Sequence, residues 1–329
     1  MKRCSLYCAA ALLIALVWAG CSTDRGPVAP NATGVAAKPA GDATASASEE
    51  TGAISPVLSA MNGQLEATGL QVRLHRAEWI VLPGSEVTEG QTVFANDRTF
   101  QLGTRWVPGD ARRNAAGDAL TYLVDRSDGK ATGGLRNAQT EPAIDRAMTT
   151  WDVTTTCSNL PIVKVADTGK DPDIVDFLLG FGRLGDPFLA DITHAGWLPK
   201  GFFDALAPGG GDFILGVTFT FVFVDGAGNA TDVNQDGFLD TALKETYYNN
   251  NFPWGINTNF PIDVESVALH ESGHALEQGH FGKIFRTDAN GEIHFAPRAV
   301  MNAAYSGIQQ SLTGDDEAGH CTLFGSWPN

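Results

Sequence analysis

Four residues between His270 and His280 have the types and the spacing that a catalytic metal site requires. His270 and His274 are four positions apart, so on a helix their imidazoles lie on one face and can bind one metal ion. Glu271 projects about 100° around the axis from His270, beside the metal, where a carboxylate can serve as general base. His280 cannot share that face, so the chain must turn back for it to bind as third ligand. Three histidines and a fourth position left for water are typical of catalytic zinc.

The elements that must position these residues can be read from capping residues and hydrophobic spacing. Asp263 is a suitable N-cap for the helix that carries the histidines. Thr313 and Asp316 form a capping box for a last helix, which Gly325 can end. Hydrophobic spacing upstream predicts a helix and three strands, near 140–151, 162–165, 174–178 and 217–224.

The histidine spacing resembles the active-site helix of the matrixins, a branch of the metzincin zinc peptidases, which reads His-Glu-x-x-His-x-x-Gly-x-x-His. The family follows this helix with a methionine turn. Residues 299–305 look like that turn, with Met301 inside it and Tyr305 in the place of the family's pocket-wall tyrosine. Residues 312–319 and 323–325 are similar to the start and the end of its last helix. The resemblance covers about 105–325 and implies an α+β fold with a twisted mixed sheet, a zinc-binding helix, a methionine turn and a C-terminal helix.

The chain departs from the family pattern at two places. Glu277 stands where the family has a glycine with positive φ, so we expect the turn to move toward Gly279, and Glu277 becomes a rival to His280 as third ligand. Leu184 stands where the first histidine of the family's structural-zinc segment would be. We therefore expect no second structural zinc, and His194 is expected to be a loop or strand-edge residue.

Oxygen-bearing side chains alternate around Gly237, as they do in calcium loops. They are Asp232, Asn234, Asp236 and Asp240. The pattern predicts a calcium site, and the alternative is an ordinary turn rich in Asp, Asn and Gly.

The first twenty residues have the pattern of an export signal. Lys2 and Arg3 precede an apolar run that is too short for a membrane span and ends just before Cys21. This end resembles a bacterial lipobox, which implies a lipid on Cys21, and Ser22 by the same resemblance favours the outer membrane. The alternative is an ordinary secretory signal. Both place the mature protein outside the cytoplasm.

The remaining chain divides by composition. We expect a signal peptide over 1–20, a flexible tether over 21–54, an N-terminal extension or propeptide-like region over 55–104, and a zinc metallopeptidase domain over 105–329. Residues 55–104 contain no cysteine, so the cysteine latch that keeps many matrixins inactive is absent. If the enzyme is latent, something else blocks its cleft.

Two further observations concern partners and compartment. Cys157 and Cys321 remain after the signal and Cys21 are set aside, which in an oxidising compartment predicts one disulfide, with two buried thiols as the alternative. The formal net charge of −16, with no basic cluster, excludes nucleic-acid binding.

The resemblance implies a membrane-tethered zinc endopeptidase that acts on proteins or peptides. His270, His274 and His280 would hold zinc, and Glu271 would take a proton from the activated water and pass it to the departing amine. Met301 would form an apolar floor and Tyr305 a pocket wall. The alternative is a surface-bound, non-catalytic, calcium-stabilised binding protein on a decayed metzincin scaffold.

Overall fold

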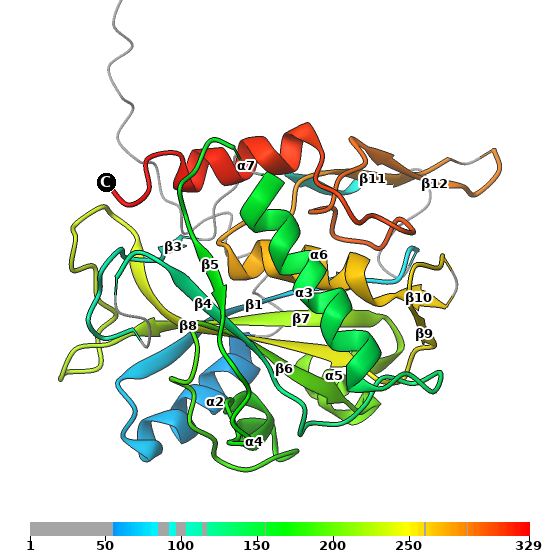
Figure 1. Cartoon of the computed structure of the whole chain (residues 1–329). Helices are drawn as coiled ribbons and strands as arrows, with labels where there is room; N and C mark the ends of the chain where they lie inside the picture. Colours follow the sequence, from blue (N-terminus) through cyan, green and yellow to red (C-terminus); the bar gives the residue numbers. More distant parts are fainter. Residues whose placement is uncertain are drawn as a thin grey trace, which may run out of the picture. The chain divides into compact units, whose positions relative to one another are not determined.

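The computed structural model describes residues 55–84, 92–96, 103–113, 117–154, 156–259, 261–287 and 289–329 (Figure 1). These residues lie in one compact unit. The expectations for the signal peptide, Cys21 and the tether fall outside the described residues. None of the helices in the described ranges has the length and apolar character that crossing a membrane requires.

The protein has a mixed α+β architecture built on a seven-stranded sheet. Its strands run in the order β1-β7-β8-β6-β4-β5, and the short strand β3 pairs with β8. β5, β4, β6 and β8 are parallel to one another, whereas β7 is antiparallel to both β8 and β1. The strand bounds are β1 Val72–Val81, β3 Thr104–Arg105, β4 Leu120–Val124, β5 Ile162–Lys164, β6 Ile192–Leu198, β7 Ile214–Phe223 and β8 Leu239–Asn249.

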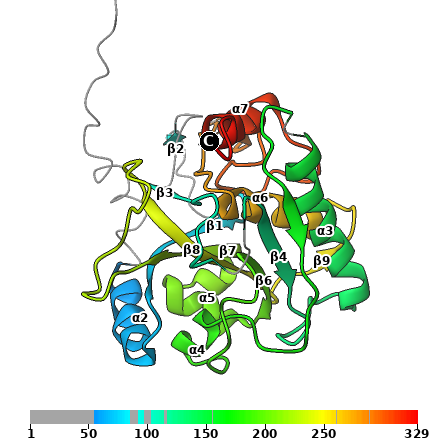
Figure 2. The same cartoon turned by 60° about the vertical axis from the view of Figure 1, so that its left-hand side comes forward.

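Helices cover both faces of this sheet, which buries β7 along all ten of its residues (Figures 1 and 2). α3 (Asn137–Thr154) and α6 (Val264–Ala275) share one hydrophobic core with the sheet. The opposite face packs against α2 (Ser55–Thr68), α4 (Val175–Leu179) and α5 (Lys200–Leu206) in a second core. The site helix α6 therefore lies directly against the sheet, and its backbone and side chains are buried along its whole length.

Smaller elements complete the fold around α6. The strands β2 (Thr92–Asn96), β11 (Gly282–Arg286) and β12 (Ile293–Ala296) form a three-stranded sheet, and β9 (Trp254–Gly255) pairs with β10 (Ile262–Asp263). A short 3-10 helix, η1, spans Gly210–Asp212. The last helix, α7, spans Gly314–Phe324.

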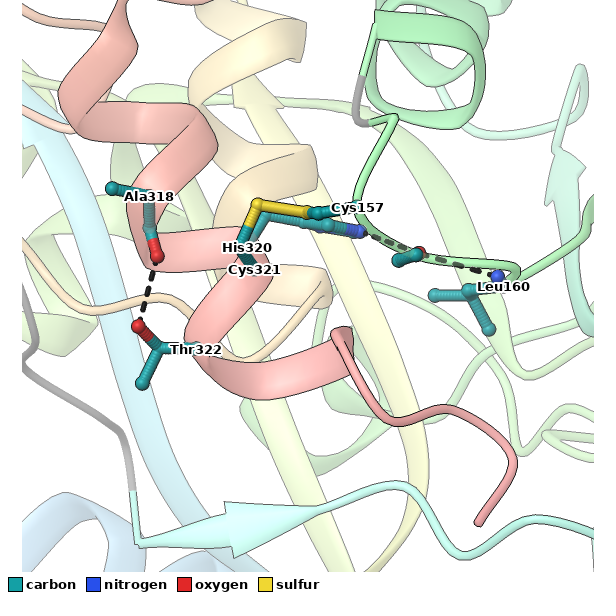
Figure 3. Close-up of a disulfide and its surroundings, with 7 residues drawn as sticks. Cys157, Leu160, Ala318, His320, Cys321 and Thr322 are labelled. Carbon is teal, nitrogen blue, oxygen red and sulfur yellow. Dashed lines mark hydrogen bonds between the residues drawn. A yellow bond between two sulfur atoms is a disulfide. The ribbon is translucent and has the colours of Figure 1, made fainter.

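The capping predictions are confirmed. Asp263 accepts the backbone N–H of Ser266 at the start of α6. Thr313 and Asp316 make the predicted capping box of α7, and Gly325 follows its last residue. Cys157 and Cys321 form a disulfide that joins the chain after α3 to α7 (Figure 3).

Two expectations for local structure are wrong. The segment 174–178 is the helix α4 and not a strand, because Ile174, Val175 and Leu178 are buried at helical spacing and the carboxylate of Glu245 accepts the first backbone N–H groups. His194 is not a loop or edge residue: it lies buried in the interior strand β6, and its Nδ1 is 2.8 Å from the hydroxyl of Tyr248.

In the N-terminal extension, the alternation of apolar and polar residues in places predicts short strands, and this prediction is correct in part. The extension contains a fourteen-residue helix, α2, followed by one continuous ten-residue strand, β1. α3 is also longer than expected, since it begins at Asn137 and contains Pro142 inside the helix. Both elements of the extension pack into the main fold and its cores.

Candidate metal centre

The three predicted histidines converge. The Nε2 atom of His280 lies 3.2 Å from Nε2 of His270 and 3.1 Å from Nε2 of His274. α6 supplies the first two residues, and the loop after α6 supplies His280. All three side chains are buried, and their ligand atoms lie within 4.8 Å of one another. The residues present can therefore hold one metal ion.

Carbonyl oxygens behind two of the rings fix their orientation. Nδ1 of His270 is 2.7 Å from the carbonyl oxygen of Val300, and Nδ1 of His274 is 2.7 Å from that of Gln278. A carbonyl can only accept, so each Nδ1 carries the proton and each Nε2 presents a lone pair. Burial is the main reason that the pKa values of His270 and His274 lie well below the ordinary value, and the neighbouring imidazoles lower both pKa values further. Both rings are therefore neutral, which is the form that binds metal.

The turn that brings His280 back occurs at Glu277, contrary to the expected shift toward Gly279. Glu277 itself adopts a left-handed conformation with φ of 64°. Just beyond it, the N–H of Gln278 donates to the carbonyl of Gly273, which closes the end of α6. The chain thus keeps the turn at the position where the family has glycine.

Glu277 is not placed as a ligand. Its carboxylate accepts hydrogen bonds from Thr104 and Thr241 and lies 2.9 Å from Nζ of Lys244. Lys244 also donates to the carbonyl of His274, at 2.8 Å. The side chain therefore points into the sheet at β3 and β8 and does not belong to the histidine group.

Glu271 lies on α6 next to the histidine group and is fully buried. Its Oε2 accepts from the hydroxyl of Thr218 at 2.7 Å, and its Oε1 accepts from the backbone N–H of Ile80 at 3.2 Å. Burial is the main reason that the pKa of Glu271 rises to about 8, and the nearby Glu78 raises it further. A carboxyl group with a pKa near neutrality can both accept and donate a proton, as general acid–base work requires.

Met301 and Tyr305 lie where the methionine turn was expected. Met301 packs so closely on α6 that a Cβ atom on Gly273 would come within 2.2 Å of its sulfur. The backbone N–H groups of Val300 and Met301 donate to the carboxylate of Asp316, at 3.0 and 3.1 Å. The hydroxyl of Tyr305 accepts from the backbone N–H at the start of α6. Asp316 therefore fixes this turn as well as capping α7, a second role that its sequence position did not reveal.

Thr218 and Lys244 were also missed. Thr218 donates to the carboxylate of Glu271, and Lys244 anchors the turn before His280. Thr218 belongs to an apolar strand pattern, and nothing in the sequence marks it as different from Thr220. Lys244 could have been noticed, because a lysine within a strand of buried residues needs a charged partner.

The predicted calcium residues are not gathered into a metal group. Asp232 accepts the backbone N–H groups of Asp236 and Gly237, and Asp240 pairs with Arg112 at 2.7 Å. Asn234 donates to the carboxylate of Asp236. The carboxylates of Asp232, Asp236 and Asp240 thus have partners within the protein.

A second acidic group lies elsewhere. Asp125, Asp128 and Asp173 place their carboxylate oxygens within 4.8 Å of one another, near the end of β4. Burial is the largest reason that the pKa of Asp128 rises to about 7, and neighbouring aspartates raise it further. Leu184, which stands where the family's structural-zinc segment has its first histidine, is exposed in the loop that follows α4. It belongs to no metal-binding group among the described residues.

Comparison with known proteins finds no family model that matches this chain, and no curated protein that matches it either. The functional argument therefore rests on the residues and geometry of the histidine site.

Proposed function

We propose that this protein is a zinc-dependent endopeptidase related to the matrixins, with His270, His274 and His280 as the metal ligands and Glu271 as the general base. The observation that carries the proposal is the convergence of three imidazole Nε2 atoms beside a buried carboxylate that is not itself in the ligand group. Three protein ligands and one remaining position are what catalytic zinc sites use.

The donor set fits zinc better than the other common ions. All three ligands are imidazole nitrogens, which suit zinc, whereas calcium and magnesium take oxygen ligands. The carbonyls of Val300 and Gln278 supply the outer contacts that orient metal-binding histidines. When bound, zinc supplies Lewis acidity that polarises a peptide carbonyl and lowers the pKa of water to about 7.

The chain's own residues then manage the protons. Glu271 accepts a proton from the attacking water and delivers it to the departing amine nitrogen. Thr218 holds one carboxylate oxygen of Glu271, and the other accepts the backbone N–H of Ile80.

We further propose that the protein acts outside the cytoplasm, attached through a lipid on Cys21. The disulfide between Cys157 and Cys321 supports an oxidising compartment. Mass spectrometry of the mature N-terminus should show an acylated cysteine, and an unmodified terminus beyond Cys21 would remove the anchor while leaving export in place.

The test combines metal analysis with one substitution and a matched control. Glu271→Gln should keep one bound zinc per chain and slow peptide cleavage by about 10² to 10⁴. Glu265→Gln, on the same helix but paired with Arg146, should leave cleavage unchanged. Cleavage of a mixed peptide library should stop on chelation. Zinc bound without cleavage by either protein would favour the non-catalytic binding protein.

A further inference from the structure

The candidate site is closed to solvent in this chain. His270, Glu271, His274 and His280 are each no more than 5% exposed. The C-terminal end of β1 covers Glu271, since the backbone N–H of Ile80 donates to its carboxylate. A peptide from outside cannot reach this carboxylate while β1 stays in place.

β1 is held on both sides, as a bound peptide strand would be. Along its length it pairs antiparallel with β7, from Val72 opposite Phe223 to Val81 opposite Ile214. At its end, Val81 also donates to the carbonyl of Ala303 at 3.1 Å and accepts from the N–H of Tyr305 at 2.9 Å. Strand addition to a sheet edge is a general way for proteins to bind extended peptides. Here β7 lies on one side of β1, and the segment 303–305, just after Met301, lies on the other.

One peptide bond of β1 is at the reaction centre. The nitrogen of the Trp79–Ile80 bond lies 3.2 Å from Oε1 of Glu271, which is the atom that must reach a departing amine. Side chains alternate along a strand, so Ile80 and Trp79 point to opposite faces. Ile80 joins the buried core cluster that contains Leu215 and Tyr305, whereas Trp79 packs on the other side.

We propose, as a step that rests on the proposed function, that this chain is its own first substrate and that the site hydrolyses the Trp79–Ile80 bond. Water adds its hydroxyl to the carbonyl carbon of Trp79, the C–N bond breaks, and the nitrogen of Ile80 keeps the electron pair. Glu271 moves the water's proton to that nitrogen. The products are a carboxylate at Trp79 and a free amine at Ile80. Until this cut, β1 competes with every other peptide for the groove and keeps the protein latent without a cysteine.

The experiment follows the full chain after zinc addition. Protein prepared in chelator is loaded with zinc and sampled for intact mass and N-terminal sequence. Wild type should gain a new N-terminus at Ile80, at a rate independent of protein concentration, because the strand and the site belong to one molecule. Glu271→Gln should slow this cut at least a hundredfold. Ile80→Gly should slow it at least tenfold, whereas Ala77→Gly, on the same strand but facing away from Glu271, should not.

A second readout needs neither zinc nor turnover. Hydrogen–deuterium exchange on metal-free Glu271→Gln protein should show the amides of Val81 and Tyr305 protected as strongly as those of β7. Rapid exchange of both amides would mean that β1 does not occupy the groove, and would overturn the proposal.

The outcomes separate this inference from the proposed function. Digestion of a peptide library by zinc-loaded protein whose Trp79–Ile80 bond stays intact would overturn self-cleavage and leave the endopeptidase in place. A first cut at another bond, or a rate that rises with protein concentration, would also overturn it. Bound zinc with neither self-cleavage nor peptide digestion, even in Ile80→Gly, would refute the endopeptidase itself.

Discussion

Replacing Glu277 by glycine tests how the turn before His280 is held. Two effects oppose each other. A left-handed non-glycine residue costs about 1 kcal/mol or more, which glycine would remove. The carboxylate, however, pairs with Lys244 at 2.9 Å, and both side chains are at most 1% exposed. Removing one partner of a buried pair costs about 3 to 5 kcal/mol. The expected net loss is therefore about 2 to 4 kcal/mol.

The measurement is urea and thermal unfolding of the metal-free protein, so that zinc binding does not contribute. At about 2 to 4 °C per kcal/mol for a domain of this size, Tm should fall by roughly 4 to 16 °C. The double variant Lys244→Met with Glu277→Gly removes both charges and the backbone strain, so it should recover most of the loss. Recovery will be incomplete, because the carbonyl of His274 loses its donor.

The reasoning is refuted if Glu277→Gly is as stable as wild type or more stable, because backbone strain would then outweigh the ion pair. It is also refuted if the two single losses simply add in the double variant, since coupled partners should not be additive.

Three further predictions follow from other parts of the structure. Cys157→Ala should lower stability by about 5 kcal/mol, the chain-entropy value for the roughly 160-residue loop that its bond to Cys321 closes, as measured by urea unfolding. Folding raises the pKa of Asp128 from 3.8 to about 7. The contribution of this group to stability is therefore full below pH 3.8 and is lost as pH rises toward 7. Measured in chelator, the Tm of Asp128→Asn should fall less steeply over this pH range than the Tm of wild type. Millimolar calcium should raise Tm if the loop around Asp236 binds it, Asp236→Ala should lose that shift, and equal Tm values with and without calcium would leave an ordinary turn.

The parts of the site that depend on neighbouring residues could be predicted from the sequence. Helical periodicity places His270 and His274 on one face, and the capping residue Asp263 sets where that helix starts. The disulfide followed from counting cysteines in a chain that begins with the pattern of an export signal. These features depend on short-range geometry or on a count, so one sequence suffices to state them.

The parts that depend on tertiary packing could not be predicted. Residues 174–178 carry an apolar run that fits a strand or a helix, and the choice is made by Glu245, about seventy residues away, which receives the first helical N–H groups. Glu277 looked like a misplaced glycine or a rival ligand, because its partners Thr104 and Lys244 come from two distant strands. In the same way, nothing local in β1 indicates that it lies over the general base.

β7 explains how the backbone at Ile80 reaches Glu271. Gly216 lies opposite Ile80 in the strand pairing, and a Cβ atom at Gly216 would come within 3.0 Å of Cγ of Glu271 and 3.1 Å of its Oε1. The missing side chain lets the general base approach the strand edge, while Thr218, two residues on and facing the same way, holds its other oxygen. A slip of one residue in the pairing would turn Ile80 away from its pocket and bring the Trp79 side chain toward the base. The same pairing that closes the site therefore also selects the bond at which it would be opened.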